Sequence, residues 1–442
     1  MRFTPWATRL ALTLSLSATA FLTACGGGGD GDSNTQVRLL NATRSYNSLD
    51  LEVDEKKVNT AVAYASAGEY ASVNTNATAT KVTANPVGTS ISATTPTLKG
   101  GTNYTYITYG FSGAIRTSLL EESEEVPAAN SAKLLVLNLA PDAGAMDVYV
   151  TAAADPLDTA TAHTTNLQGG AGSGYIKINS GTFRVRVTGY NKRSDLRLDI
   201  PAVTLDSASV NTLILTASDG GVLVNGITLV QKGAVKNFAN TQSRVRTVAA
   251  LANAGTVVSS INGQSMFGTA TATSPLISDY VTTASGAPTQ FSVTVNGTAR
   301  TFTAPTLAAG KDTTLLVWGD VADPKLSVLD DDNRLPTVAG DVKVRLVNAL
   351  PTSGAGLNVA FGSIASNIAA GSASTFGTTS SSTTGVQVDL SVPAAGTIYT
   401  NTALVFPANS VWTFFAVPTT TATGTTTSPV PFFGAVPKRE RP

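Results

Sequence analysis

The clearest chemistry in this sequence belongs to Cys25, the only cysteine among 442 residues. It closes the tetrapeptide Leu-Thr-Ala-Cys at residues 22–25, at the end of an apolar run over residues 10–22. That run is too short to span a bilayer, and Arg2 and Arg9 give the chain start a positive charge. A positive start, an apolar core and small residues before a cysteine are typical of a bacterial lipoprotein signal. We therefore predict that the Cys25 thiol carries a lipid.

The residues around Cys25 also predict where the mature protein is held. Residues 1–24 form the predicted signal peptide, and residues 25–35 form a Gly-rich tether that behaves as a flexible coil. Two or three acyl chains anchor a protein stably to a membrane. Gly26 follows the cysteine, whereas Asp at this position is the inner-membrane retention signal in enteric-type Gram-negative bacteria. We predict a lipid-anchored envelope protein, in the outer membrane rather than the inner, on its periplasmic or surface face. The alternative is an ordinary secretory signal.

Acid–base and transition-metal chemistry has few candidate residues in this chain. His163 is the only histidine, and one histidine without cysteine partners cannot build a typical zinc site. We predict that it lies in an exposed loop. A Ser-His-Asp triad would need the same residue, and no G-x-S-x-G or S-x-x-K motif is present. The carboxylate pair of a glycosidase leaves no spacing signal, so an extracellular hydrolase stays open as the least favoured reading. We predict that the protein is not an enzyme and has no cofactor.

Two acidic clusters are the remaining candidates for ligand chemistry. Asp330, Asp331 and Asp332 could bind Ca²⁺ weakly, because hard cations take oxygen ligands from loops. The spacing of an EF-hand is absent, which favours a solvated linker. Residues 121–125, with four glutamates, favour the same interpretation because like charges repel and stay hydrated.

The composition excludes a nucleic-acid partner and a disulfide framework. Lys and Arg number 29, as do Asp and Glu, so there is no basic excess to attract nucleic acid. Charged residues make up 13% of the chain, well below the ~25% usual in globular domains. With the single cysteine lipidated, stability must come from apolar cores alone.

The mature chain repeats itself four times. Similar short apolar strands begin each copy, at residues 37–42, 134–140, 245–250 and 344–349. The starts lie roughly a hundred residues apart, which is about one β-sandwich domain each. Alternating apolar and polar residues predict strands with one buried face, and helical patterns are nearly absent. The fold prediction is all-β, with tandem immunoglobulin-like antiparallel β-sandwich domains. An extended β-solenoid is the rival, but its repeats are shorter.

The predicted organisation follows from these repeats. The β-sandwiches are expected at residues 36–127, 131–233, 243–333 and 341–438. The joints near Glu125, Lys236 and Asp332 are expected to be hydrated linkers and early protease sites between separately folded sandwiches. Trp318 and Trp412 occupy matching final strands, where filling a core is favoured over a sugar-stacking platform.

Two further features recur at matching positions. An aromatic residue precedes a short strand in every copy, as Tyr70, Tyr175, Tyr280 and Phe376. Asp50, Asp147 and Asn358 occupy one slot near a turn in three copies. Asp and Asn share a side-chain oxygen that accepts backbone N–H bonds, but only Asp is charged. We therefore predict a structural role for this slot, with charge dispensable and Asp147→Asn mild.

The opening of the second copy resembles the bacterial domain-of-unknown-function family 4397. The residues that carry the resemblance are Asn138, the run 140–143 and the strand 147–150, followed by the runs 174–175 and 181–187. The resemblance is looser in copies one and four and weakest in copy three. It implies secreted or cell-surface β-sandwich modules, often in tandem, and it transfers no catalytic residues.

Together these observations predict a non-enzymatic envelope protein. A rod of sandwiches would space, scaffold or bind something outside the cytoplasm. The expected partners are the membrane, through the lipid, and an unknown envelope protein or glycan. The alternative is a carbohydrate- or peptide-binding accessory lipoprotein that uses loops at one end of a single sandwich.

Overall fold

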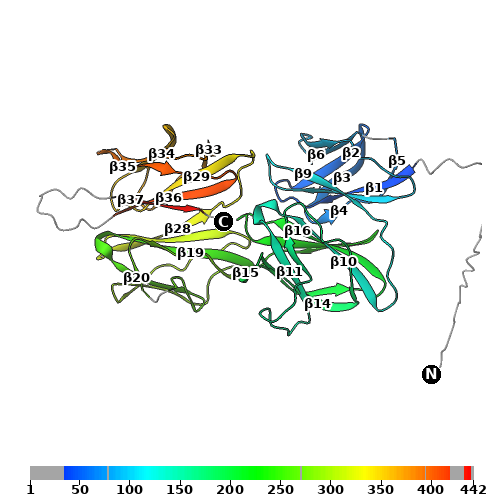
Figure 1. Cartoon of the computed structure of the whole chain (residues 1–442), viewed down its shortest axis with the longest axis horizontal. Helices are drawn as coiled ribbons and strands as arrows, with labels where there is room; N and C mark the ends of the chain where they lie inside the picture. Colours follow the sequence, from blue (N-terminus) through cyan, green and yellow to red (C-terminus); the bar gives the residue numbers. More distant parts are fainter. Residues whose placement is uncertain (1–33, 77–78, 269–270, 394, 419–432, 440–442) are drawn as a thin grey trace, which may run out of the picture.

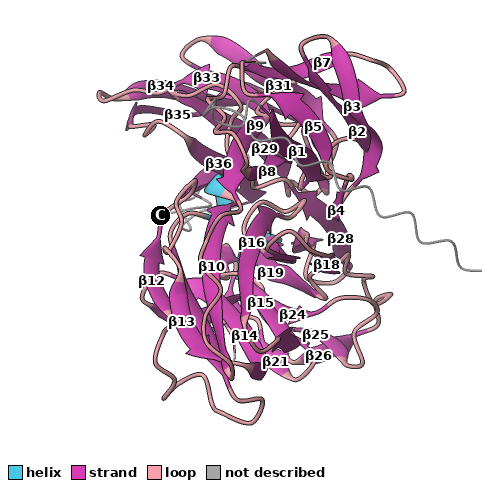
Figure 2. Cartoon of the chain, turned by 90° about the vertical axis from the view of Figure 1, so that its right-hand side faces the viewer, coloured by secondary structure: helices cyan, strands magenta, loops and turns pink. Residues whose placement is uncertain are grey.

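The computed structural model describes residues 34–76, 79–268, 271–393, 395–418 and 433–439. This part of the chain is built of β-strands, with two short 3₁₀ segments and no α-helix (Figure 2). Four successive stretches each fold into two facing sheets around an apolar core. The predicted all-β fold of tandem sandwiches is therefore confirmed.

In each sandwich we call the sheet that contains the first strand the inner sheet and the opposite one the outer sheet. The inner sheet of the first sandwich contains β4 (Ser66–Ala67), β5 (Ala71–Asn74), β1 (Asn34–Asn41), β8 (Asn103–Tyr109) and β9 (Arg116–Glu121). Its outer sheet contains β3 (Lys56–Ala63), β2 (Ser48–Val53), β6 (Thr80–Asn85) and β7 (Ser90–Thr94). Side chains from both sheets, such as Leu39 and Leu51, are fully buried between them.

The second sandwich repeats this plan with longer strands. Its inner sheet contains β13 (Ile176–Asn179), β10 (Ser131–Leu139), β16 (Ser209–Ala217), β17 (Val224–Val230) and β18 (Val235–Phe238). Its outer sheet contains β12 (Thr164–Leu167), β11 (Met146–Thr151), β14 (Gly181–Gly189) and β15 (Lys192–Leu205). A 3₁₀ turn, η1 (Pro141–Ala143), joins the two sheets, and Pro at its first position suits the fixed φ that such a turn needs.

The third and fourth sandwiches follow the same order. The inner sheet of the third contains β23 (Leu276–Ile277), β24 (Val281–Ala284), β19 (Gln242–Leu251), β27 (Asp312–Gly319) and β28 (Pro324–Asp331). Its outer sheet contains β21 (Gln264–Ser265), β22 (Ala272–Thr273), β20 (Thr256–Ile261), β25 (Phe291–Val295) and β26 (Thr298–Arg300), and η2 (Ala252–Ala254) links the sheets. In the fourth, the inner sheet contains β32 (Ser372–Ala373), β33 (Gly377–Ser380), β29 (Asp341–Asn348), β36 (Ser410–Pro418) and β37 (Phe433–Arg439). The outer sheet contains β31 (Gly362–Ile368), β30 (Ala355–Val359), β34 (Val386–Val392) and β35 (Gly396–Leu404).

One strand pair in every sandwich departs from an antiparallel arrangement. The first strand pairs in parallel with a late one: β1 with β8, β10 with β16, β19 with β27 and β29 with β36. Parallel neighbours need a long crossover connection, and here the outer-sheet strands provide it. All other strand pairings in the described chain are antiparallel.

The sandwiches associate in two pairs through their inner sheets. Apolar side chains from both sandwiches of the first pair form one cluster, including Leu40, Ile107, Tyr109, Leu139, Ile214 and Ile227. An equivalent cluster in the second pair includes Val248, Leu316, Trp318, Val347, Phe415 and Val417. Figure 1 shows the first pair in blue to green on one side and the second pair in green to red on the other. We call these units the first pair and the second pair.

This pairing explains why the inner strands are apolar on both faces. Every residue of β27 is buried, and β8 and β29 are buried after their first residue. In β16 all residues between the first and the last are buried. Strands covered on both faces read as continuous apolar runs, whereas outer strands such as β20 alternate between buried and half-buried residues. The sandwiches are therefore not arranged as the expected rod: each pair is a stack of four packed sheets.

Glu125 and Lys236 are exposed, as expected for hydrated joints, and Asp332 is half-buried, but each joint also contains a buried residue that the sequence did not predict. Glu122 is 1% exposed, Asp331 is 3% exposed and Asn240 is 5% exposed. Each has fixed partners; Asn240, for example, donates to the Val224 carbonyl oxygen at 2.8 Å. Glu122 and Asp331 can be buried because arginines from neighbouring strands neutralise them.

The two pairs also contact each other. The Gly220 backbone N–H donates to the Gly310 carbonyl oxygen at 2.9 Å, and the Thr282 hydroxyl donates to the Leu196 carbonyl oxygen at 3.3 Å. The segment that joins the third sandwich to the fourth adds a bond from the Leu335 N–H to Asp142 Oδ2 at 3.1 Å. The four sandwiches thus form one body with two pairs side by side.

Candidate functional site

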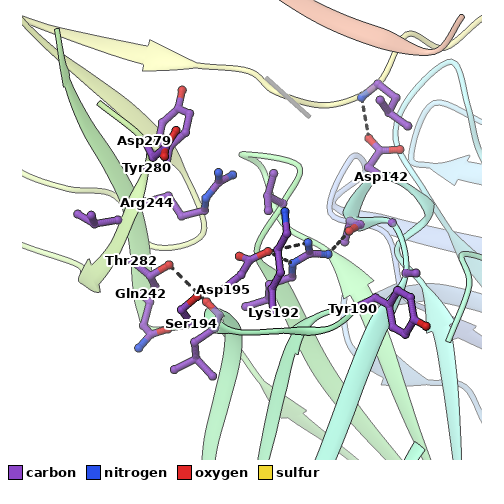
Figure 3. A pocket seen from close by; sticks show the side chains of 18 of the residues that line it. Asp142, Tyr190, Lys192, Ser194, Asp195, Gln242, Arg244, Asp279, Tyr280 and Thr282 are labelled. Carbon is purple, nitrogen blue, oxygen red and sulfur yellow. Dashed lines mark hydrogen bonds and ion pairs between the residues drawn. The ribbon is translucent and has the colours of Figure 1, made fainter. Parts of the chain in front are cut away.

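A cleft of about 1100 Å³ opens between the second and third sandwiches (Figure 3). One wall comes from η1 and from the turn between β14 and β15, and the other from the start of β19 and the residues around β24. Leu335 and Asn409, which belong to the fourth sandwich and its approach, complete the lining. The cleft therefore exists only because the two pairs are held side by side.

Arg244 projects from β19 into this cleft, and contacts with Asp312 and Tyr280 hold its side chain in place. Its Nη1 lies 2.8 Å from Asp312 Oδ2, and its guanidinium lies 4.4 Å from the ring centroid of Tyr280. The Arg244 side chain is 12% exposed. An arginine stacked on an aromatic ring and bonded on one side keeps its other N–H donors for a ligand.

The opposite wall presents Tyr190 and Lys192 at the turn between β14 and β15. Asn191 turns the chain with a φ of 55°, a conformation that Asn tolerates better than most residues. Tyr190 is 43% exposed at the rim, and Lys192 is exposed. Of the residues that the structure describes, none forms an ion pair with Lys192. In Figure 3 the Lys192 ammonium and the Arg244 guanidinium both point toward the open centre of the cleft.

The floor beside Lys192 is fixed by Asp195 and Arg197. Arg197 donates to Asp195 Oδ2 from Nε at 3.1 Å and from Nη2 at 2.8 Å, and it also donates to the Ala143 carbonyl oxygen. Asn240 Nδ2 donates to the Arg197 carbonyl oxygen at 2.6 Å. These bonds tie the wall of the cleft to the joint between the pairs, so the lining is preorganised.

A second hollow of about 410 Å³ lies beside the cleft and shares Asp142 and Leu335 with it. Arg334 lies 4.7 Å from the Phe111 ring centroid and donates twice to Asp332 at 2.7 Å. Burial raises the pKa of Asp332, but the bond from Arg334 and the charge of Lys343 outweigh it and lower that pKa to about 2. Asp332 therefore anchors the segment around Leu335, which lines both hollows.

The three predicted calcium ligands face cations instead of a common centre. Asp330 lies on the surface, 3.5 Å from Lys311 Nζ, and Asp332 pairs with Arg334 and Lys343. Asp331 points inward, where its side chain is fully buried. Within the described ranges no group of three or more His, Cys, Asp or Glu residues could hold a metal ion. The cluster is therefore an anchor between the third and fourth sandwiches, and not the solvated linker expected.

Asp331 is the centre of a buried network. It accepts bonds from Arg345 Nη2, from the Thr314 hydroxyl and from the Tyr280 hydroxyl, and Arg246 Nη2 lies 3.7 Å from Oδ2. Burial by itself would raise the pKa of Asp331, but the charges of Arg345 and Arg246 hold that pKa below its ordinary value. One carboxylate thus joins arginines from two sandwiches.

The first pair contains the same network in a different form. Arg38 Nη2 lies 3.3 Å from both carboxylate oxygens of Glu122, and the Tyr70 hydroxyl donates to Glu122 Oε1 at 2.6 Å. Arg38 Nη1 also donates to the Gly233 carbonyl oxygen of the second sandwich at 2.9 Å. The Lys232 backbone N–H donates to Glu122 as well. Glu122 therefore ties the two sandwiches of the first pair together.

Sequence reasoning did not connect the residues of these networks, although the signal was present. Matched positions in three opening strands carry an arginine, and each donates to a threonine on the parallel strand: Arg38 to Thr105, Arg246 to Thr314 and Arg345 to Thr413. The repeated aromatic residue lies beneath that arginine in the same three copies, as Tyr70, Tyr280 and Phe376. In copies one and three, an arginine of the opening strand, an aromatic residue further along and an acid at the end of the last strand recur at matching positions. This combination would have predicted a buried ion pair.

The slot shared by Asp50, Asp147 and Asn358 does not have one common hydrogen-bond pattern. Asp147 accepts the Asn166 N–H at Oδ1 at 2.9 Å and the Asn191 N–H at Oδ2 at 3.0 Å. Asp50 accepts the Ala61 N–H at 2.8 Å and lies 2.7 Å from Lys57 Nζ. Asp147 therefore uses both carboxylate oxygens, a pattern that an asparagine cannot reproduce.

We expect Asp147→Asn to destabilise the protein nearly as much as Asp147→Ala, by about 1–3 kcal/mol, because an amide N–H₂ would face a backbone N–H donor. Chemical denaturation followed by circular dichroism measures this change. Asp158→Asn, at an exposed position in the same sandwich, is the matched control and should leave stability unchanged. A mild effect of Asp147→Asn beside a severe one of Asp147→Ala would support the simpler expectation from the sequence.

Four other residues singled out in the sequence remain to be located. His163 is half-buried and not exposed as expected; burial lowers its pKa, and its Nε2 has no hydrogen-bond partner in the described structure. Trp318 lies between the third and fourth sandwiches, and Trp412 packs edge-on against Phe406 at 5.4 Å. Cys25 lies outside the described residues. Among the described residues, no helix has the length and apolar character needed to cross a membrane.

The fold and the cleft define an all-β protein of paired sandwiches with a polar hollow at their junction. The family model described as Domain of unknown function (DUF4397) matches residues 35–149 and 243–359, together more than half of the chain. The chain therefore belongs to the DUF4397 family, as its resemblance predicted. The two matches run through the first and third sandwiches and into the openings of the second and fourth, whereas residues 131–233 were expected to match best. No curated protein matches the chain.

Comparison with solved structures adds only distant likenesses. A carbohydrate-binding module of family CBM26 from Eubacterium rectale, crystallised with maltoheptaose, is 12% identical, with a TM-score of 0.17; the alignment covers 46% of this chain and 97% of that one. The Bacillus anthracis TIE protein is 10% identical, with a TM-score of 0.14, and the alignment covers 88% of this chain and 69% of that one. Neither likeness supports a functional argument.

Proposed function

We propose that this protein is a lipid-anchored, non-enzymatic binding protein of the cell envelope and that the cleft between its pairs is the binding site. The observation that carries the proposal is the cleft itself, about 1100 Å³ in volume, with charged and polar groups held in fixed positions around it. Pockets for small molecules measure roughly 300–1,000 Å³, so this cleft suits an extended ligand. The ligand site lies between sandwiches and not on the end loops of one.

The state of the cleft carboxylates disfavours the hydrolase alternative. Asp195 is held by Arg197, and Asp142 accepts the Leu335 N–H. A glycosidase needs a carboxylic acid and a second carboxylate that face each other across the scissile bond, and both of these aspartates already have bonds within the protein. Binding without turnover is the function that this lining favours.

A pull-down from envelope fractions tests the proposed binding. The bait is the mature chain with Cys25→Ser, which removes the lipid. We expect an envelope polymer to be retained, and Ser194→Trp, which places a large ring in the cleft, to abolish retention. Ser90→Trp, an exposed position on β7 of the first sandwich, is the matched control and should keep it. Equal retention by both variants, or none by the unsubstituted bait, would rule out the cleft as a binding site.

We further expect the mature protein to begin at Cys25 and to carry acyl chains there. The lipoprotein signal and the Gly-rich tether motivate this expectation. Mass spectrometry of the N-terminal peptide from membrane fractions measures it directly, and Cys25→Ser should move the protein into the soluble fraction. An unmodified Cys25, or cleavage at another residue, would contradict the anchor without affecting the cleft.

A further inference from the structure

We propose that the cleft between the pairs binds a carboxylate-bearing oligosaccharide, with Lys192 and Arg244 as the groups that bind its carboxylate. This inference rests on the proposed function and names the ligand class of that site. Two features of the lining carry it: two cations that point into the cleft and an exposed aromatic ring.

Two cations of the lining, Lys192 and Arg244, point into the open centre of the cleft (Figure 3). The lining also contains three acids: Asp195 is paired with Arg197, Asp142 accepts a backbone N–H, and Asp279 has an interaction within the protein. The described residues give Lys192 no ion-pair partner, and Arg244 is paired with Asp312 through Nη1. A ligand anion would therefore meet the charge of Lys192 and the remaining N–H donors of Arg244.

The rim supplies an apolar surface of the right kind. Tyr190, two residues before Lys192, lines the cleft and is 43% exposed. A sugar ring has an apolar C–H face that packs on an aromatic ring while its hydroxyls bond elsewhere. The carboxylate and the C–H face of an acidic sugar thus each have a matching group in the lining.

An acidic peptide fits less well. Peptides are commonly bound by adding a strand to a free sheet edge. In the lining, β24 lies at such an edge of its sheet, but β15 packs beside it, and the Thr282 hydroxyl donates to the Leu196 carbonyl oxygen of β15. The remaining polar groups are side-chain tips on turns, which suit hydroxyls and carboxylates better than a peptide backbone.

Calorimetry on the mature chain with Cys25→Ser tests the inference with three acidic probes: oligogalacturonate, a sialylated oligosaccharide and a peptidoglycan fragment that contains muramic acid. The controls are carboxyl-reduced oligogalacturonate and an oligoglutamate peptide. We expect at least one acidic saccharide to bind, with affinity falling as salt rises, and its carboxyl-reduced form to bind about tenfold more weakly. Lys192→Gln should cause a similar loss, while Lys56→Gln, at an exposed position outside the cleft, should not.

The other outcomes separate the two proposals. Equal binding of neutral and acidic saccharides, unaffected by Lys192→Gln, would overturn the carboxylate inference and leave the binding function intact. Tighter binding of oligoglutamate, lost in Lys192→Gln, would overturn the saccharide class. Failure of all three acidic saccharides to bind overturns the inference, and the envelope pull-down then decides whether the binding function survives.

Discussion

Asp331→Ala is expected to destabilise the protein by about 3–5 kcal/mol, because it removes the carboxylate that lies between two buried arginines. The side chains of Arg246 and Arg345 are 0% and 2% exposed, and Asp331 is the carboxylate between them. Removing one partner of a buried pair costs more than the pair contributes, since the remaining charge cannot reach water. The loss should appear as a lower midpoint in guanidinium chloride, followed by circular dichroism.

The neighbouring residue provides the control for this experiment. Asp330→Ala makes the same chemical change at a side chain that is 77% exposed, and it should alter stability by less than about 0.5 kcal/mol. Replacing all three network residues together, by Arg246→Met, Asp331→Leu and Arg345→Met, should recover part of the loss, because both arginines and their shared carboxylate are then removed together. Equal midpoints for Asp330→Ala and Asp331→Ala would show that the network carries no stability.

Phe415→Ala is expected to cost about 3–5 kcal/mol, although the residue lies outside the core of its own sandwich. Phe415 is fully buried in the cluster between the third and fourth sandwiches, and the Arg246 guanidinium lies 5.4 Å from its ring centroid. A cavity there weakens the contact between two sandwiches and not the interior of either. Trp318 belongs to the same cluster, so its fluorescence should report the opening of the interface.

Phe361→Ala is the matched control, because Phe361 is 81% exposed in the same sandwich. It should change the free energy of unfolding by less than about 0.5 kcal/mol. If Phe415→Ala were as mild as Phe361→Ala, the sandwiches would be independent units that merely touch, as expected from the sequence. A large effect with a red shift of Trp318 emission would make the pair the cooperative unit.

The family matches agree with the pair as the repeating unit. Each match begins at the first strand of a pair and ends in the opening strands of its second sandwich, at residues 149 and 359. The matched segment therefore includes both sides of the pair interface, with Leu40 and Leu139 in the first pair and Val248 and Val347 in the second. The boundaries predicted for the individual sandwiches remain a proposal.

The sequence by itself determined the all-β fold, the four repeats and the family. These follow from local patterns: alternating apolar residues, turn residues and recurring strand openings are readable wherever they stand in the chain. The lipid anchor is likewise a local signal, and it remains a prediction because Cys25 lies outside the described residues. Local patterns also indicated Asp147 as a structural residue, although not that both of its oxygens accept bonds.

Only the tertiary structure decided what the acidic clusters do and where the cleft lies. Glu122 and Asp331 read as hydrated linker residues because charge normally stays in water, and their burial depends on arginines that are distant in the sequence: Arg38 is 84 residues from Glu122. The cleft has the same origin, since Lys192 and Arg244 stand on different sandwiches and face each other only after the pairs dock. Contacts between distant segments leave no spacing signal, so the packing of complete sheets had to be seen before the site could be recognised.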